Sequence, residues 1–167
     1  MFLDGICTCY AEILNKIIFC IHPMTEAEIA MCITQALSNL YKDDFGLIRV
    51  EAEEESISAH LTNYLKPYFK TWNVDIEYNR DGQVTKKNSG GDSIFPDIII
   101  HRRTPDRGER NSPENNLVAI EVKGHWNRKN RRIDELKLID MKKRYGYQYL
   151  FRIELEPEQG RLISIRE

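Results

Sequence analysis

Two short apolar segments flanked by charged residues constrain this chain more than any other feature of its sequence. Phe95–Ile100 reads FPDIII and Leu117–Gly124 reads LVAIEVKG. Apolar runs of this length, bounded by turn-forming residues, are typical of buried β-strands. They place Asp97 at the start of one strand and Glu121-x-Lys123 at the end of the next. If the two strands pair antiparallel, we expect Asp97 to lie across from Glu121.

This arrangement would bring together the groups that a metal-assisted hydrolase needs. Side chains alternate along a strand, so Glu121 and Lys123 share one face. A hard divalent cation such as Mg2+ prefers oxygen ligands and retains several waters. Asp97, Glu121 and the backbone carbonyl of Val122 are therefore candidate ligands for Mg2+, with Mn2+ as a substitute. Lys123 is a candidate for orienting or deprotonating a water and for offsetting charge on a phosphate.

Each of these motifs alone is a weak signal. Acid and lysine pairs are common at strand ends, and Pro105-Asp106 repeats the PD dipeptide in a segment that reads as a loop. We prefer Pro96-Asp97 because it leads directly into an apolar strand. The order PD, strand, connector, strand, E-x-K and basic stretch favours a metal site over an incidental surface pair.

The remaining sequence alternates between helical and strand patterns. Helical spacing of apolar residues predicts helices over 26–41, about 52–69 and 131–144. The apolar positions of the last helix are Ile133, Leu136, Ile139 and Met141. Strands are predicted over 72–78, 94–102, 117–123, 147–155 and 161–165, with a turn-rich loop at 79–91. The order ααβββαββ predicts an α/β fold with a mixed sheet flanked by helices.

The first residues of the chain differ from the remainder. Residues 1–23 are apolar, but charged residues interrupt every run, so no stretch approaches the roughly 20 apolar residues of a membrane span. The basic start of a secretory signal is missing. Thr25 and Glu28 then form a capping-box pattern that opens a helix. We expect residues 1–23 to be an added helix or extension, and residues 24–167 to form a single domain.

The cysteines indicate the compartment. All four, Cys7, Cys9, Cys20 and Cys32, lie near the N-terminus, and their spacing does not match paired zinc ligands. Reduced thiols in a cytoplasmic protein are the preferred interpretation.

Charge is distributed unevenly along the chain. Residues 66–150 carry 18 Lys and Arg against 12 Asp and Glu, whereas residues 1–65 carry 3 against 10. Such basicity beside the carboxylates suits a polyanionic partner, and DNA is preferred; the alternative is an ordinary solvated face. The run KGHWNRKNRR supplies the candidate nucleic-acid-binding residues His125, Arg128, Lys129, Arg131 and Arg132.

These motifs together resemble the PD-(D/E)XK nuclease superfamily, which has the restriction-endonuclease-like fold. The segments VDIEYNR, FPDIIIHRR, NNLVAIEVKG and a Tyr-Gly-Tyr strand entry are similar to small bacterial members, from about Glu51 to the C-terminus. The resemblance implies a site where the strands of a central sheet separate, and Mg2+-dependent hydrolysis that leaves a 5′-phosphate. It implies Asp97 and Glu121 as metal ligands and Lys123 as the catalytic lysine.

The resemblance also implies an acidic residue from the helix before the first strand. The competing residues are Glu51, Glu53, Glu54 and Glu55. Helical geometry favours Glu54, because it shares the face of Ile57 and Leu61, whereas Glu55 is directed to solvent. The alternative is that these glutamates only complement the helix macrodipole.

The expected function is therefore a Mg2+-dependent endonuclease that acts on DNA. Two alternatives stay open, a nuclease-fold module that binds nucleic acid or protein without cleavage, and a structure-specific junction resolvase. A homodimer fits an enzyme that cuts both strands of a duplex, and no membrane partner is expected.

Overall fold

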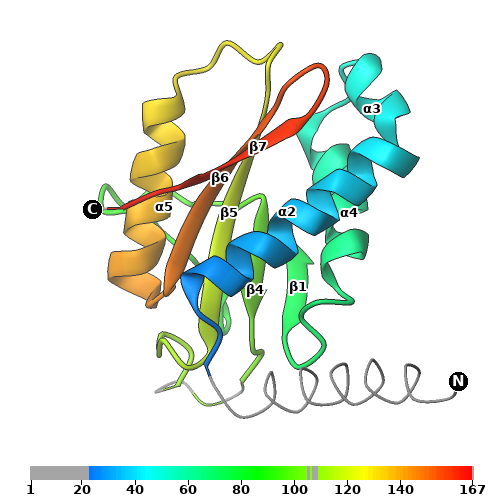
Figure 1. Cartoon of the computed structure of the whole chain (residues 1–167). Helices are drawn as coiled ribbons and strands as arrows, with labels where there is room; N and C mark the ends of the chain where they lie inside the picture. The colour runs from blue at the N-terminus through cyan, green and yellow to red at the C-terminus, as the bar shows by residue number, and fades with distance from the viewer. Residues whose placement is uncertain (1–22, 105, 107–108, 167) are drawn as a thin grey trace, which may run out of the picture. The chain divides into compact units, whose positions relative to one another are not determined.

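A computed structural model describes residues 23–104, 106 and 109–166 of the chain (Figure 1). The chain divides into two compact units, residues 1–31 and 32–167. The predicted extension at residues 1–23 lies almost wholly outside the described residues, so it stays a prediction. No helix of the described part is long and apolar enough to cross a membrane.

Among the described residues, three helices precede the first strand. Helix α2, Glu26–Asp43, opens with the predicted capping box, since the Glu28 N–H donates to Thr25 Oγ1 at 3.3 Å and the Thr25 N–H donates to Glu28 Oε2 at 2.8 Å. A short helix that the sequence did not predict, α3, spans Phe45–Arg49. Helix α4, Glu54–Leu65, is shorter than predicted and ends two residues before Pro67, which has no N–H to continue a helix.

The central sheet has five strands in the order β1-β4-β5-β6-β7. Their bounds are β1 Asn73–Ile76, β4 Ile98–His101, β5 Asn116–Gly124, β6 Tyr149–Leu155 and β7 Gly160–Ser164. Only β5 and β6 are parallel neighbours, and the other pairs are antiparallel. A parallel pair requires a crossover connection, which helix α5, Arg131–Tyr145, provides. The predicted mixed sheet flanked by helices is confirmed.

The predicted antiparallel pairing of the two apolar strands is also confirmed. Ile98 pairs with Ile120 and Ile99 with Ala119, and the register shifts after Ile100. All residues of β4 and β5 are buried. Extending this register by one residue places Asp97 opposite Glu121.

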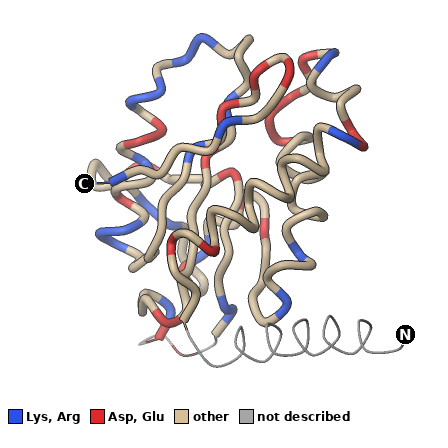
Figure 2. The backbone as a smooth tube through the Cα atoms, viewed as in Figure 1, with Lys and Arg blue, Asp and Glu red and all other residues tan. Residues whose placement is uncertain are grey.

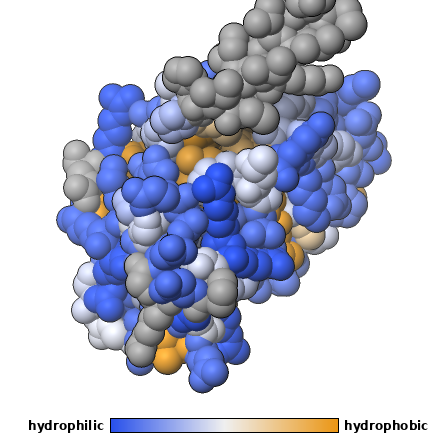
Figure 3. All heavy atoms as spheres, turned by 90° about the horizontal axis from the view of Figure 1, so that it is seen from below, coloured by the Kyte–Doolittle hydropathy of each residue, from blue (hydrophilic) through white to orange (hydrophobic). Residues whose placement is uncertain are grey.

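Helix α5 covers one face of the sheet, and α2 crosses the other in the view of Figure 1. On the α5 side, the core joins Ile99 and Ala119 of the strands with Leu138, Met141 and Tyr145 of the helix. On the other side, α2 approaches β7 so closely that a Cβ at Gly160 would lie 2.3 Å from a Leu37 methyl carbon. The surface seen from below this view is mostly hydrophilic, with small apolar patches (Figure 3).

The face that α5 presents to the sheet differs from its apolar pattern. Ile133 and Leu136 are 65% and 49% exposed, whereas Asp134 is buried together with Leu138 and Met141. The first turns of α5 face charged strand residues, and ion pairs rather than apolar contacts fix the phase of the helix there.

The segment predicted as a loop contains a small hairpin. Strands β2, Arg80–Asp81, and β3, Val84–Thr85, pair antiparallel across a two-residue turn. Gly82 occupies the first turn position with a φ of 66°, which glycine adopts without strain.

Candidate functional site

The two carboxylates of the sequence motif meet where β4 begins and β5 ends. Asp97 Oδ2 accepts a hydrogen bond of 2.6 Å from the Val122 N–H. Glu121, on β5, is 1% exposed. The predicted neighbourhood of Asp97 and Glu121 is therefore present in the structure.

Both carboxyl groups are held in an environment that disfavours negative charge. Burial raises the pKa of Glu121 well above its usual value, and the nearby Asp97 raises it further. Burial also raises the pKa of Asp97, although Lys137, the Val122 N–H and Lys123 oppose the shift. Two neighbouring buried carboxylates ionise together only when cations compensate them.

The oxygen atoms around this pair fit a hard cation. Glu121 Oε1 is buried and accepts no hydrogen bond. The Val122 N–H points to Asp97, and its carbonyl faces the same side, because a strand residue presents both groups to the same neighbour. The described residues contain no cluster of three or more His, Cys, Asp or Glu arranged for a metal. Two carboxylates and a carbonyl suit Mg2+, which keeps several waters.

Lys137 of α5 is a site residue that the sequence analysis missed. Its Nζ lies 2.5 Å from Glu121 Oε2 and donates to the Phe95 carbonyl at 2.8 Å. This ammonium group partly compensates the buried Glu121. The signal that could have found it is the position of Lys137, one turn after Asp134 on a helix that crosses the end of β5.

Lys123 lies next to the carboxylate pair and is itself nearly buried. Its Nζ is 3.2 Å from Glu54 Oε2 and 3.5 Å from Asp134 Oδ2. Burial lowers the pKa of Lys123, but the charges of Glu54 and Asp134 outweigh burial and raise the pKa above its usual value. Lys123 is therefore a cation at neutral pH, suited to orienting a water rather than deprotonating it.

Glu54 connects α4 to the end of β5. Besides the contact with Lys123, its Oε1 accepts hydrogen bonds from the Gly124 N–H at 2.8 Å and from Asn127 Nδ2 at 2.9 Å. Glu55 is exposed, as the helical phase predicts. Among the competing glutamates, Glu54 contacts the end of β5 through these hydrogen bonds, whereas Glu53 makes no side-chain cap.

The basic run after Lys123 divides into two groups. Arg131 is held within the protein, since it donates to the Gly124 carbonyl at 3.1 Å and lies 3.5 Å from Glu154. Arg132 is exposed and pairs with Glu135 at 3.2 Å. His125, Arg128 and Lys129 are exposed on the β5–α5 loop. Figure 2 shows Lys and Arg along this loop and along α5, so a cationic surface borders the carboxylates.

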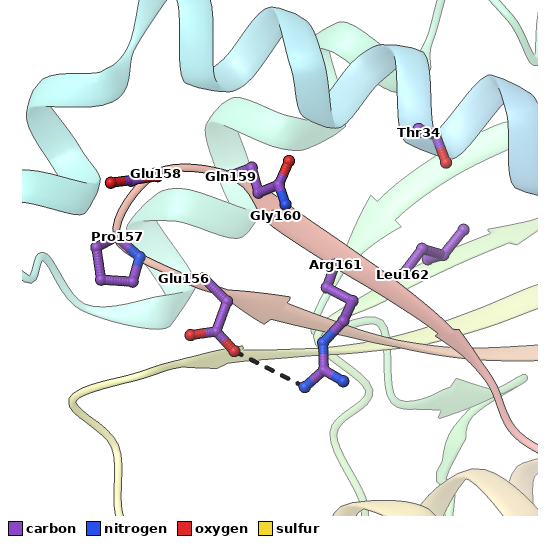
Figure 4. A pocket seen from close by; sticks show the side chains of 8 residues that line it. All are labelled: Thr34, Glu156, Pro157, Glu158, Gln159, Gly160, Arg161 and Leu162. Atoms are coloured by element: carbon purple, nitrogen blue, oxygen red, sulfur yellow. Dashed lines mark ion pairs between the residues drawn. The ribbon is translucent and has the colours of Figure 1, made fainter.

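A separate hollow of about 540 Å3 lies beside the β6–β7 turn (Figure 4). Glu156, Glu158 and Arg161 are its charged side chains, and Glu156 lies 3.7 Å from Arg161. This hollow contains none of the predicted site residues. We therefore assign the chemistry to the buried carboxylates and not to this hollow.

Comparisons of the chain with models of protein families, with curated proteins and with solved structures found no match.

Proposed function

We propose that this protein is a Mg2+-dependent endonuclease with a restriction-endonuclease-like fold, and that DNA is its substrate. The observation that carries the proposal is the pair of half-buried Asp97 and buried Glu121, with one Glu121 oxygen that has no hydrogen-bond partner. Such a pair needs a cation, and a cation at a strand end beside a basic surface suits phosphodiester chemistry.

Asp97, Glu121 and the Val122 carbonyl would hold the ion. When bound, Mg2+ neutralises charge on the phosphate and lowers the pKa of a coordinated water. The protein residues prepare this site by removing competing water and by fixing the two carboxylates on paired strands whose side chains are buried.

Lys123 supplies a fixed positive charge beside the reacting phosphate. Its ammonium group orients the attacking water. It also donates hydrogen bonds to the phosphate oxygens, on which negative charge develops. Glu54 keeps Lys123 in place through the 3.2 Å contact and through its hydrogen bond with the Gly124 N–H. Glu54 is thus a positioning residue.

The exposed side chains of His125, Arg128, Lys129 and Arg132 would contact backbone phosphates. Contacts of this kind position a duplex without reading its sequence. They predict binding that weakens steeply as the salt concentration rises.

The test is incubation of the full chain with supercoiled plasmid and Mg2+, beside Lys123→Ala. We expect nicking or linearisation that requires the metal and falls by about a hundredfold or more in the variant, the range of one catalytic group. Lys142→Ala removes an exposed lysine of α5 and serves as the matched control.

Wild-type protein that leaves linear, branched and single-stranded DNA intact with both Mg2+ and Mn2+ would contradict the proposal. Binding without cleavage would then favour the module that only binds nucleic acid. Cleavage confined to branched substrates would favour the junction resolvase.

A further inference from the structure

A second charged pocket lies at the opposite end of β4 from the carboxylates. Its volume is about 90 Å3. Its charged lining comprises five basic side chains and one carboxylate, namely Arg80, Lys86, Arg102, Arg103, Arg110 and Asp81. His101 also lines the pocket, and burial lowers its pKa, so it adds no charge at neutral pH. The pocket is strongly cationic although it is part of a chain with net charge −2.

Three separate segments bring these cations together. β4 ends at His101 and continues into Arg102 and Arg103, the β2–β3 hairpin contributes Arg80, and the segment that leads to β5 contributes Arg110. Figure 2 shows basic residues gathered at this lower end of the strand. Cations from distant parts of the sequence converge here, as in a binding site and unlike a solvated charge run.

The rear of the pocket is held by an internal network. Asp75 of β1 pairs with Arg103 through two hydrogen bonds, and it contacts His101 Nε2 at 2.9 Å. Arg102 stacks on the Trp72 ring at 4.2 Å. These contacts orient two guanidinium groups before any ligand arrives, which lowers the entropic cost of binding.

Lys86 forms the floor of the pocket and is 4% exposed. Its ammonium donates to the Arg80 carbonyl at 2.9 Å and lies over the rings of Tyr78, Tyr145 and Tyr147. No carboxylate lies within ion-pair distance of Lys86 among the described residues, and burial lowers its pKa to about 8. Asp81 and Asp75 oppose this shift in part, and an anion in the pocket would stabilise the buried cation further.

Gly82 makes room for Arg110 at the mouth of the pocket. A Cβ at Gly82 would lie 1.9 Å from Arg110 Nη1, so the guanidinium rests directly on the turn of the β2–β3 hairpin. Arg110 Nε donates to the Thr104 carbonyl at 3.2 Å. The hairpin, absent from the predicted elements, thus places one wall of the pocket.

We propose that this pocket binds one phosphate group, at a site separate from the catalytic carboxylates. Its volume of about 90 Å3 is sufficient for a tetrahedral oxyanion. Planar guanidinium groups bind phosphate oxygens in pairs, and several of them surround this volume. The phosphate would belong to a nucleic acid, an assignment that rests on the proposed function.

The test is titration of the metal-free full chain with inorganic phosphate at low ionic strength, followed by NMR or calorimetry. We expect saturable binding that weakens about tenfold in Arg80→Gln and in Arg110→Gln, since each removes hydrogen bonds to a charged group. Arg161→Gln, which removes an exposed arginine from the β6–β7 hairpin, should bind phosphate as the wild type does. Thermal unfolding of each variant verifies that it is folded.

Absence of saturable binding, or equal weakening in Arg161→Gln, would overturn the proposal. The metal-free experiment is independent of cleavage, so saturable phosphate binding supports this pocket even if the proposed nuclease function is wrong. Competition by 5′-phosphorylated against 5′-hydroxyl oligonucleotides then identifies the source of the phosphate. Stronger competition by the phosphorylated form indicates a strand end, equal competition indicates the backbone, and no competition by either overturns the assignment to nucleic acid.

Discussion

The two ends of β4 carry opposite kinds of charge and handle them differently. Just before the first residue of the strand, half-buried Asp97 lies beside buried Glu121 of β5, nearby cations compensate them only in part, and the pKa values of both are raised. At the last residue, basic side chains converge around a small pocket, and Asp75 is paired with Arg103 so firmly that its pKa is lowered, although burial opposes this. One end therefore lacks positive charge and the other lacks negative charge.

The two ends of β4 thus place electrostatic environments of opposite sign within one small domain. A buried strand separates the groups, so the carboxylates and the arginines do not neutralise each other. At each end, charge is only partly compensated by the protein, and a ligand of opposite charge from solvent can compensate the remainder. This incomplete compensation lowers the stability of the free protein.

The largest expected effect comes from removing charge at the carboxylate end. Glu121→Gln should abolish stabilisation by Mg2+, which in the wild type reaches about 2.7 kcal/mol at a hundredfold excess over the dissociation constant. The variant should also melt at a higher temperature than wild type without metal at neutral pH, because it removes a buried carboxyl whose ionisation is disfavoured. Thermal unfolding with and without Mg2+ measures both effects.

Glu158→Gln alters an exposed carboxylate and is the control for this comparison. It should keep the full response to Mg2+. A Glu121→Gln protein that Mg2+ stabilises as much as wild type would show that the cation binds elsewhere.

Neutralising Glu54 should have a smaller effect on the same end of the strand. Glu54→Gln keeps the shape but weakens the contact with Lys123, so we expect cleavage to slow by about tenfold and stability to fall by about 1 kcal/mol. Glu55→Gln, one residue further and exposed, should change neither. If both variants cut DNA equally well, Glu54 does not position Lys123.

Stability should respond to pH in opposite directions at the two ends. A carboxyl whose pKa is raised by folding, such as Glu121, contributes stability below its unfolded pKa of about 4.3, and this contribution is lost as the pH rises through the folded pKa. A carboxyl whose pKa is lowered, such as Asp75, contributes above about 3.9 and loses this as the pH falls.

Urea unfolding of the metal-free protein at pH values from about 3 to about 9, in steps of about one pH unit, measures this dependence of stability on pH. Glu121→Gln should reduce the loss of stability as the pH rises above the unfolded pKa of the Glu121 carboxyl. Asp75→Asn should reduce the loss of stability as the pH falls on the acid side. A wild-type curve that rises steadily with pH and is unchanged in Glu121→Gln would contradict the raised pKa.

The smallest effect on the carboxylate end is expected from the turn of the β2–β3 hairpin. Gly82→Ala should cost about 1–2 kcal/mol, because Gly82 has a φ of 66°, and it should also displace Arg110 and weaken phosphate binding. Binding of Mg2+ at the other end should not change. Gly46→Ala in α3, where an added Cβ has open space, should be neutral or stabilising, which calorimetric melting can compare directly.

The sequence predicted those parts of the fold in which a single local residue pattern determines the structure. The apolar runs of β4 and β5 exclude solvent, so both strands and their pairing followed from the sequence. Glu54 followed from its helical phase with Ile57. The position of Asp97 across from Glu121 followed from an antiparallel register.

What the sequence did not predict depends on contacts between distant elements. In α5 the apolar residues Ile133 and Leu136 are exposed while Asp134 and Lys137 face the strands, because ionic contacts with Lys123 and Glu121 outweigh the apolar pattern. The pocket of arginines likewise combines three segments, and no local spacing marks it. The hairpin had one local signal, the Asp81-Gly82 pair, which is typical of tight turns.

β4 also fixes the distance between the charged groups at its two ends. It has four residues, all buried, and a strand rises about 3.3 Å per residue, so Asp97 and His101 are about 13 Å apart along it. Double-stranded DNA rises about 3.4 Å per base pair, which makes this distance about four base-pair steps. A residue inserted into β4 would turn every following side chain to the opposite face of the sheet. The length of β4 therefore cannot change by a single residue without moving these side chains.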